Sequence, residues 1–254
     1  MNIPKLSLDQ LQYTYIPPKK PAGPVLHDLS MHVGVGEFVS VIGPSGSGKS
    51  TLLQIIGGLI TPTRGEVYMD GSVVTSQKGL ISYMPQQPSL LPWRTVEDNV
   101  ILVQELMGIP RKESIQLART WLSRAGLSGY ESSFPYQLSG GMQQRASFLR
   151  ALLSPRELMC LDEPFASLDA LTRADMQLWL TDIWQNDRRS VLFITHSIEE
   201  AIFLSDRIYV ITDKPATVLN EIKVPFERPR QIEIQLDVSF LQLRQAIYEN
   251  LKQG

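Results

Sequence analysis

The stretch Gly43-Pro44-Ser45-Gly46-Ser47-Gly48-Lys49-Ser50-Thr51 decides the fold of this chain. The apolar run at residues 38–42 precedes it and is typical of a buried strand, and residues 52–56 follow it with the pattern of a helix start. A strand, a glycine-rich loop and a helix form the context that the phosphate-binding motif G-x-x-x-x-G-K-[ST] requires. The sequence therefore predicts a phosphate site between this strand and this helix.

The residue types in the loop explain how it would hold a nucleoside triphosphate. Gly43, Gly46 and Gly48 let the backbone curl, so that successive N–H groups and the positive end of the next helix point at phosphate oxygens. Lys49 can reach the β- and γ-phosphates, and Ser50 can offer its hydroxyl to magnesium. The alternative is a glycine-rich turn capped by a serine, which the flanking strand and helix disfavour. The predicted nucleotide contacts in the loop are Gly43, Ser45, Gly46, Ser47, Gly48, Lys49, Ser50 and Thr51.

Composition restricts the class of protein. The 254 residues are 43% hydrophobic and 20% charged, as in a soluble globular protein, and the net charge of −2 argues against a nucleic-acid partner. No run of about 18 apolar residues is present, and the N-terminus lacks the apolar core of a signal peptide. The one cysteine, Cys160, excludes an internal disulfide framework and fits a reducing cytoplasm. Neither Cys160 nor the three histidines suggest a metal-ligand cluster.

Periodicity predicts how the chain is divided. Residues 5–15 alternate loosely, which predicts an edge strand, and strand patterns alternate with helix patterns along most of the remaining chain. Residues 88–155 carry only helical patterns, at 96–107, 111–125 and 141–153, which predicts a helical insertion. Further strands are expected at 25–33, 66–69, 81–84, 157–163, 190–195 and 207–211, with helices at 170–186, 198–204 and 239–252. This alternation predicts an α/β fold with a mainly parallel sheet covered on both faces and an antiparallel β edge.

We therefore expect three units. Residues 1–87 and 156–225 would form a catalytic ATP-binding core, residues 88–155 an inserted helical subdomain, and residues 226–254 a short tail that ends in a helix.

Two carboxylates and two further polar residues follow predicted strands. Asp162 and Glu163 end the buried run at 158–161, where an α/β sheet binds its ligands. Asp162 can hold magnesium, and Glu163 can polarise the water that attacks the γ-phosphorus. His196 can contact a γ-phosphate and orient that water, and the amide of Gln86 can reach magnesium or the same water. The alternatives are solvated acids, a structural histidine and a polar turn residue.

A second segment also fits an anion. In Leu138-Ser139-Gly140-Gly141-Met142-Gln143-Gln144-Arg145, the serine can cap a helix and the two glycines let the backbone approach a phosphate. One nucleotide does not need two such segments, so this one would serve a nucleotide held by another copy of the chain. The alternative is an ordinary capped helix. Tyr15 is the candidate for stacking on the nucleobase, the alternative being a strand tyrosine without a ligand.

Together these motifs resemble the ATP-binding-cassette family over about residues 5–215. GPSGSGKST at 43–51 matches its phosphate loop, LSGGMQQR at 138–145 its signature, LMCLDEP at 158–164 its magnesium strand and SLD at 167–169 its dimer-contact motif. Gln86 matches the family's glutamine loop, His196 its switch histidine and Tyr15 its adenine-stacking aromatic residue. The family fold is of the P-loop NTPase (RecA-like) type.

The resemblance implies a head-to-tail dimer that sandwiches two ATP molecules with Mg²⁺. Each site then takes Gly43–Thr51 from one chain and Ser139, Gly140 and Gly141 from the other. Catalysis would fall to Glu163, His196 and Gln86, and the metal to Ser50, Gln86 and Asp162.

A finer resemblance points to an importer. The segments LLPWRTV at 90–96 and PFASLDALTR at 164–173 are similar to those of ATPase subunits of nitrate, sulfonate and taurine importers. That likeness implies two separate transmembrane permease subunits, an extracytoplasmic solute-binding protein and a peripheral position on the cytoplasmic face of the membrane. Trp93 would face the permease; the alternative is that it packs within its own subdomain. Ala166-Ser167, Ser197 and Phe148-Leu149 depart from the usual residues without removing a catalytic group.

A second class of function shares every catalytic residue: a soluble single-cassette ATPase that acts in cofactor assembly. Its partner would be a soluble scaffold rather than a permease. A chromosome or repair ATPase would need long coiled-coil insertions, which the sequence lacks, and a P-loop kinase would have no use for the signature.

Overall fold

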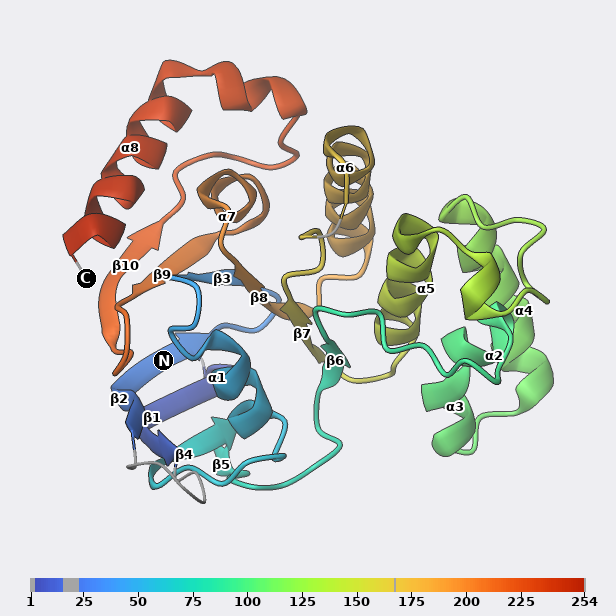
Figure 1. The fold of residues 1–254 in the computed structure, drawn as a ribbon, viewed down its shortest axis with the longest axis horizontal. Coiled ribbons are helices and arrows are strands. Elements are labelled where there is room, and N and C mark those ends of the chain that lie inside the picture. The colour runs from blue at the N-terminus through green and yellow to red at the C-terminus, as the bar shows by residue number, and fades with distance from the viewer. Residues whose placement is uncertain (1–2, 16–22, 167, 254) are drawn as a thin grey trace.

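Two β-sheets form the body of the protein. The structure, a computed structural model, describes residues 3–15, 23–166 and 168–253. A four-stranded antiparallel sheet has the order β2-β1-β4-β5, and a six-stranded sheet has the order β10-β9-β3-β8-β7-β6 (Figure 1). The strands are β1 (Leu6–Tyr15), β2 (Gly23–Val33), β3 (Phe38–Ile42), β4 (Arg64–Met69), β5 (Ser72–Val73), β6 (Ser82–Met84), β7 (Leu158–Asp162), β8 (Ser190–Thr195), β9 (Arg207–Ile211) and β10 (Val218–Lys223).

Helices cover these sheets and form a separate group at one end of the larger one (Figure 1). They are α1 (Lys49–Ile56), α2 (Val96–Val100), α3 (Leu102–Leu106), α4 (Arg111–Arg124), α5 (Gly140–Leu152), α6 (Ala170–Asn186), α7 (Ile198–Leu204) and α8 (Val238–Gln253), with short 3₁₀ turns at Pro135–Gln137 and Ile232–Leu236. None of the helices in the described residues is both long and apolar enough to cross a bilayer.

The larger sheet has the predicted form. Strands β9, β3, β8, β7 and β6 are parallel, and β10 adds an antiparallel edge. Every residue of β3, β7 and β8 is buried, because parallel strands have helices or a second sheet on both faces. Helix α1 packs its apolar residues between the two sheets, in one core with residues of β1, β2, β3 and β8. The loop before α1 therefore lies between two well-packed elements, the buried strand β3 and the helix α1.

The prediction that residues 5–15 form an edge strand is wrong. Strand β1 pairs with β2 on one side and with β4 on the other, so both of its edges are hydrogen-bonded. The alternation that predicted the strand is present, since Leu6, Leu8 and Leu11 are buried. A period of two reports which face of a strand is buried, and it carries no information about its hydrogen-bonded edges.

The helix predicted over residues 96–107 is two short helices. Thr95 caps α2 through its side chain, and the backbone tightens at Ile101, with φ −84° and ψ −2°, before α3 begins. The hydrophobic spacing continues through the junction, because one tightened turn moves the buried face only slightly. Val96, Val100 and Ile101 are all buried.

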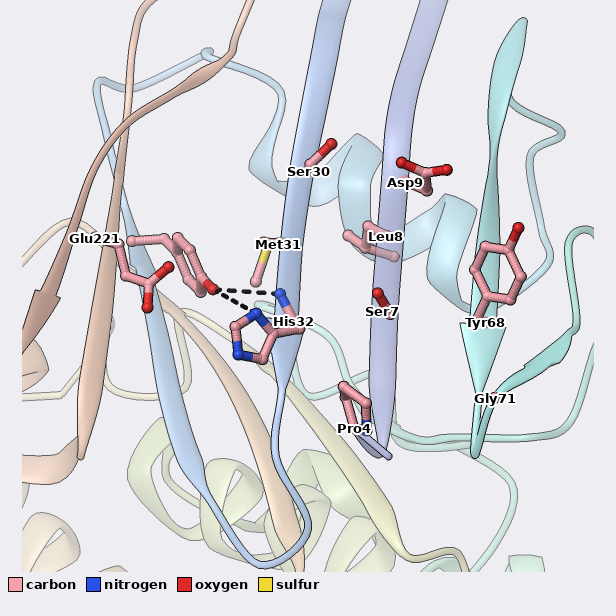
Figure 2. Close-up of a pocket in the computed structure, with 11 residues that line it drawn as sticks. Pro4, Ser7, Leu8, Asp9, Ser30, Met31, His32, Tyr68, Gly71 and Glu221 are labelled. Carbon is pink, nitrogen blue, oxygen red and sulfur yellow. Dashed lines mark hydrogen bonds between the residues drawn. The ribbon is translucent and has the colours of Figure 1, made fainter. Parts of the chain in front are cut away.

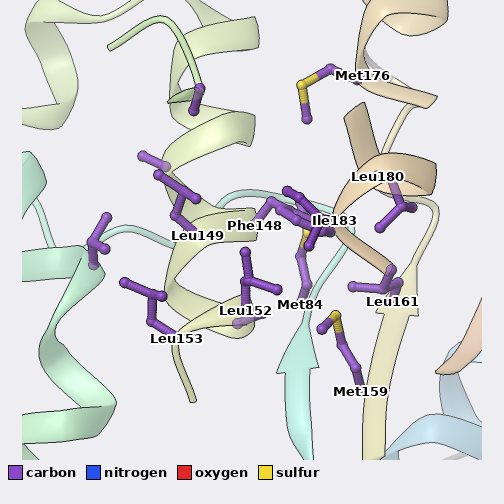
Figure 3. Close-up of a cluster of buried hydrophobic side chains, with 14 of the residues drawn as sticks. Met84, Phe148, Leu149, Leu152, Leu153, Met159, Leu161, Met176, Leu180 and Ile183 are labelled. Atoms are coloured by element: carbon purple, nitrogen blue, oxygen red, sulfur yellow. The ribbon is translucent and has the colours of Figure 1, made fainter. Parts of the chain in front are cut away.

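The helical group shares its core with the large sheet. Figure 3 shows α5 side chains, among them Phe148 and Leu152, beside Met84 of β6 and Leu161 of β7. Leu180 and Ile183 of α6 complete the same cluster. The division into a core, a helical subdomain and a tail stays a prediction, because the apolar packing runs continuously from α5 into the sheet.

A buried arginine fastens the C-terminal tail to the core. Helix α7 ends at Leu204, where its last carbonyl groups need hydrogen-bond donors. The guanidinium of Arg230 donates to the carbonyls of Ile202, Phe203 and Ser205 at distances of 2.7–3.0 Å. It also binds the carbonyl of Phe226, and burial lowers the pKa of Arg230 to about 10. The side chain thus caps α7 from the tail.

Replacing Arg230 by methionine should lower the free energy of unfolding by roughly 3 kcal/mol, because several buried carbonyls lose their donor. Urea denaturation followed by circular dichroism would measure the loss. Arg244→Met, at a half-exposed arginine on α8, is the matched control and should change stability by less than about 0.5 kcal/mol. Equal stability of the two variants would show that Arg230 does not anchor the tail.

Candidate functional site

Four neighbouring parallel strands end at one edge of the large sheet. Ile42 of β3 pairs with Thr195 of β8, Asp162 of β7 pairs with Ile194, and Met84 of β6 pairs with Leu161. The residues that follow these strands therefore emerge at the same edge: the loop that begins at Gly43, then His196, Glu163 and Gln86. Segments that are more than 100 residues apart in the sequence meet there because parallel strands align their carboxyl ends.

The loop between β3 and α1 has the backbone that its glycines permit. A Cβ atom on Gly43 would lie 2.5 Å from Cγ1 of Ile211, so only glycine fits against β9. Gly48 has φ +110° and a space closed by Val25, and Gly46 has φ +82° with open space around it. The chain therefore turns tightly while Gly46 leaves its backbone open to a ligand.

Lys49 is the first residue of α1, and its ammonium lies over the loop. Its Nζ donates to the carbonyl oxygens of Gly43 (2.8 Å) and Pro44 (2.7 Å). Burial lowers the pKa of Lys49, whereas the charges of Glu163 and Asp162 act to raise it. The cation is thus poorly hydrated, and an anionic ligand at the loop would stabilise it.

The other loop residues differ in exposure. Ser45, Gly46 and Ser50 are exposed, Thr51 is half-buried, and Ser47 is buried. Among the described residues the hydroxyl oxygen of Ser47 has no hydrogen-bond partner. The hydroxyl of Ser50 acts to lower the pKa of Asp162, so two of the predicted metal ligands lie near each other.

Asp162 is suited to a divalent cation. Its side chain is 4% exposed, and burial raises the pKa of this carboxyl, as does the charge of Glu163. The hydroxyls of Ser50 and Tyr83 oppose that shift, with Tyr83 Oη 3.4 Å from Oδ2 of Asp162. Mg²⁺ prefers such hard oxygen donors and takes the rest of its ligands from water and phosphate. The described residues hold no group of three or more His, Cys, Asp or Glu that could bind a metal ion.

Glu163 brings together the three residues predicted to act in catalysis. Its Oε2 accepts a hydrogen bond from Nε2 of Gln86 at 3.0 Å, and Nδ1 of His196 lies 3.2 Å from the same oxygen. The backbone of Glu163 is left-handed, with φ +44°, while its N–H still donates to Ile194 at 2.9 Å. A non-glycine residue with positive φ is uncommon and tends to occur at functional sites. This turn directs the carboxylate toward Gln86 and His196.

The second glycine segment begins α5 and is separate from these contacts. Ser139 caps the helix by accepting the N–H of Met142 at 3.3 Å, as predicted. In the described part of the chain, Ser139, Gly140 and Gly141 share no hydrogen bond or ion pair with the loop at 43–51. Among the described residues, a Cβ on Gly140 would meet no atom within 4 Å, and one on Gly141 would touch Leu168 and Thr172 at 3.5 Å. Packing against the described residues therefore does not require either glycine.

Tyr15 ends β1 with its side chain 56% exposed. It pairs with Gly23 of β2, two residues before Val25, which contacts the phosphate loop at Gly48. This places an exposed aromatic ring at the end of β1, next to the strand that contacts the loop. Most of the Pro-rich segment at 17–24, and Ser167 of the predicted dimer-contact motif, lie outside the described residues.

Tyr83 was missed by the sequence reasoning. It lies on β6, and the strand pattern around Gln86 gave no indication that its hydroxyl reaches Asp162. Its pairing with Cys160, two residues before Asp162, is known only once the register of β6 and β7 is known.

A cavity of about 650 Å³ lies on the outer face of the antiparallel sheet and reaches β9 and β10 (Figure 2). His32, Asp9 and Glu221 are among its lining residues, and the hydroxyl of Tyr209 lies 3.2 Å from Nδ1 of His32. None of the predicted site residues lines it. The cavity is thus distinct from the edge where the phosphate loop lies.

Known proteins resemble this chain in sequence and in fold. The family model described as "ABC transporter" matches residues 26–166. The formylaminopyrimidine import ATP-binding protein of Halalkalibacterium halodurans is 42% identical, over 90% of this chain and 88% of that protein. The nitrate import ATP-binding protein of Synechocystis sp. is 42% identical, over 78% of this chain and 75% of that protein. A dimeric ATP-binding cassette, solved in a post-hydrolysis state with ADP and Pi, matches with a TM-score of 0.75 and 32% identity, over 87% of this chain and 100% of that one.

These matches confirm the predicted fold, a P-loop NTPase with a mostly parallel sheet, and the predicted family. Both the phosphate loop and the signature segment lie within the matched residues. The chain therefore belongs to the ABC transporter family, as an ATP-binding subunit that is an ATPase coupled to transport.

Proposed function

We propose that this chain drives an importer by hydrolysing ATP with Mg²⁺ at the interface between two copies of itself. The observation that carries the proposal is the junction at Glu163, where Gln86 and His196 contact one carboxylate oxygen beside Asp162 and the phosphate loop. Solute would enter through separate membrane subunits, fed by an extracytoplasmic binding protein. The nitrate and formylaminopyrimidine import ATP-binding proteins, together with the sequence resemblance to sulfonate importers, favour a small solute such as nitrate, a sulfonate or a formylaminopyrimidine.

The residues of one chain supply half of the reaction site. Gly43 to Thr51 would wrap the phosphates, with Lys49 on the β- and γ-phosphates and Tyr15 against the adenine. Ser50, Asp162 and Gln86 would hold Mg²⁺, which neutralises phosphate charge when bound. Glu163 would accept a proton from the attacking water, and His196 would orient that water toward the γ-phosphorus. Burial of Asp162 and Lys49 supports these roles, since both need an oppositely charged ligand.

A second copy would complete the site with Ser139, Gly140 and Gly141. Two observations support this. No described atom lies within 4 Å of a Cβ placed on Gly140, and the N-terminus of α5 is a place where backbone N–H groups bind anions. A phosphate on the neighbouring copy would explain the missing side chains, because the backbone must approach it closely. The dimeric cassette with ADP and Pi has the same fold.

The surface of the helical group offers a docking site for the membrane subunits. Trp93 is 72% exposed, so it does not pack within its own helical group, and Leu106 is 78% exposed. Leu106 and Met107 line a groove of about 290 Å³ between α3 and β6, together with Tyr83 and Arg150. Exposed aromatic and aliphatic side chains beside a groove are typical of interfaces. The chain would then lie on the cytoplasmic face of the membrane, held there by its partners.

Copurification tests the importer proposal. The chain should bind candidate permease subunits in detergent, and they should stimulate ATP hydrolysis. Combining Trp93→Ala with Leu106→Ala should weaken this binding by about 30-fold, or roughly 2 kcal/mol, because two apolar anchors are lost. ATP affinity should not change.

Leu236→Ala is the matched control, because Leu236 is as exposed as Leu106 but lies in the tail. If the double variant bound the permease as tightly as the wild type, this surface would not be the docking site. Copurification of a soluble scaffold, with no membrane chain, would favour the cofactor-assembly function instead.

A further inference from the structure

Glu200 is a buried carboxylate directly behind the candidate site. It lies on α7, which begins two residues after His196, and it is 6% exposed. Burial raises the pKa of Glu200, against the hydroxyl of Thr195 and the charge of Arg173. A buried acid needs hydrogen bonds that offset its lost hydration, so its partners show what it holds in place.

One oxygen of Glu200 holds the turn that carries His196. The hydroxyl of Thr195 donates to Oε2 of Glu200 at 2.6 Å. The same hydroxyl oxygen accepts the backbone N–H of Ser197 at 3.0 Å. Thr195 and Ser197 flank His196, so this pair of bonds sets the backbone from which the imidazole projects toward Glu163. Glu200 selects the direction in which the Thr195 hydroxyl points.

The other oxygen of Glu200 faces the segment that follows Glu163. Oε1 lies 3.9 Å from Nε of Arg173 on α6, and this Nε has no hydrogen-bond partner among the described residues. The same guanidinium donates through its NH2 group to the carbonyl of Leu168 at 2.9 Å. Leu168 precedes Asp169, which caps α6 through its side chain. Glu200 thus connects the turn at His196 to Leu168 through Arg173.

We propose that Glu200 is a positioning residue for ATP hydrolysis. Through Thr195 it holds His196 against Glu163. Through Arg173 it connects this arrangement to the loop at Leu168. The proposal rests on the proposed role of His196. It also extends that role: Leu168 and Asp169 belong to the predicted dimer-contact motif, so a shift of Leu168 when two copies meet would reach His196 through Arg173 and Glu200. Misplacing a reacting group by about 1 Å can lower a rate by roughly 100-fold.

The experiment measures kcat, KM and ATP affinity for the purified full-length chain. Glu200→Ala and Thr195→Val should each lower kcat by about 10-fold to 100-fold, with ATP affinity and KM within about twofold of wild type. Glu200→Gln keeps an oxygen that accepts the Thr195 hydroxyl, so its kcat should fall by only about threefold. Glu113→Ala is the control, an exposed glutamate on α4 far from this turn in the sequence, and should leave kcat unchanged.

A double variant separates positioning from a loss of folding. If Glu200 acts through His196, Glu200→Ala combined with His196→Ala should be no slower in single-turnover hydrolysis than His196→Ala alone. The proposal would be overturned if the rate losses of the two single variants multiplied in the double variant. It would also be overturned if Glu200→Gln and Glu200→Ala lowered kcat equally. A parallel loss of ATP affinity in the single variants would overturn it as well. Wild-type hydrolysis by His196→Ala would instead refute the proposed role of His196, whatever the result for Glu200.

Discussion

Replacing Glu163 by glutamine is expected to lower kcat by about 1000-fold while ATP still binds, because an amide cannot accept the proton of the attacking water. Glutamine has the shape of glutamate and adopts the left-handed backbone at this position at a similar cost, so the fold should persist. Phosphate release would report turnover, and a fluorescent ATP analogue would report binding. Glu113→Gln, at an exposed position on α4, is the control. Unchanged hydrolysis would refute the role of Glu163.

The same variant should accumulate as an ATP-bound dimer, because hydrolysis would no longer reopen it. Light scattering after gel filtration would measure its mass. Adding Gly140→Asp should abolish the dimer without weakening ATP binding to the single chain, since the new carboxylate would face the γ-phosphate of the other copy. A Cβ at this position meets no described atom within 4 Å. Glu163→Gln with Ser128→Asp adds the same charge at an exposed site as a control. A stable dimer of the Gly140→Asp variant would place the second glycine segment outside the nucleotide site.

The second large effect is expected for Lys49→Ala, which should raise the Kd for ATP by about 100-fold, or roughly 2.7 kcal/mol. The ammonium lies over the loop within hydrogen-bond distance of Gly43 and Pro44, where it can turn to the phosphates. Alanine is a good helix former at the first position of α1, and removing a buried cation does not open the core. Two loop carbonyls lose a donor in this variant, but the desolvated cation is removed with it, so stability should change by less than about 1 kcal/mol.

Direct titration by calorimetry would measure the affinity of Lys49→Ala, and thermal unfolding without nucleotide would check its fold. Lys78→Ala, at an exposed lysine, should bind ATP like the wild type. An unchanged Kd for Lys49→Ala would contradict the phosphate role of the loop. A loss of stability without ATP would show that the lysine serves the fold instead.

Most of the secondary structure could be predicted from the sequence. Helices α6 and α7 and strands β8 and β9 have the predicted bounds, because each has a strong local pattern between clear stop signals. Local sequence patterns did not predict the features that depend on which strands pair with each other. The alternation in β1 identified a strand but could not show that β4 would occupy its second edge.

Some features of the candidate site could likewise be predicted from the sequence, and others could not. The phosphate loop, the signature segment and the family follow from short motifs, because glycine, lysine and serine at these spacings serve few other purposes. The motifs could not show that Gln86 and His196 share one oxygen of Glu163, or that Tyr83 reaches Asp162. They also gave no sign that the Thr195 hydroxyl donates to Glu200, because a glutamate on a helix is ordinarily exposed.

The amino-acid sequence by itself thus determines which chemical groups are available and on which strands and helices they lie. This is so because backbone preferences and motif chemistry depend on only a few neighbouring residues. Which of those groups touch is settled by the register of β6, β7, β8 and β3, a property of strands up to 150 residues apart. Burial at Asp162, Lys49 and Glu200 follows from the same packing, and so do the shifted pKa values of those groups. The chemistry at Glu163 therefore depends on long-range strand pairing that no local stretch of residues encodes.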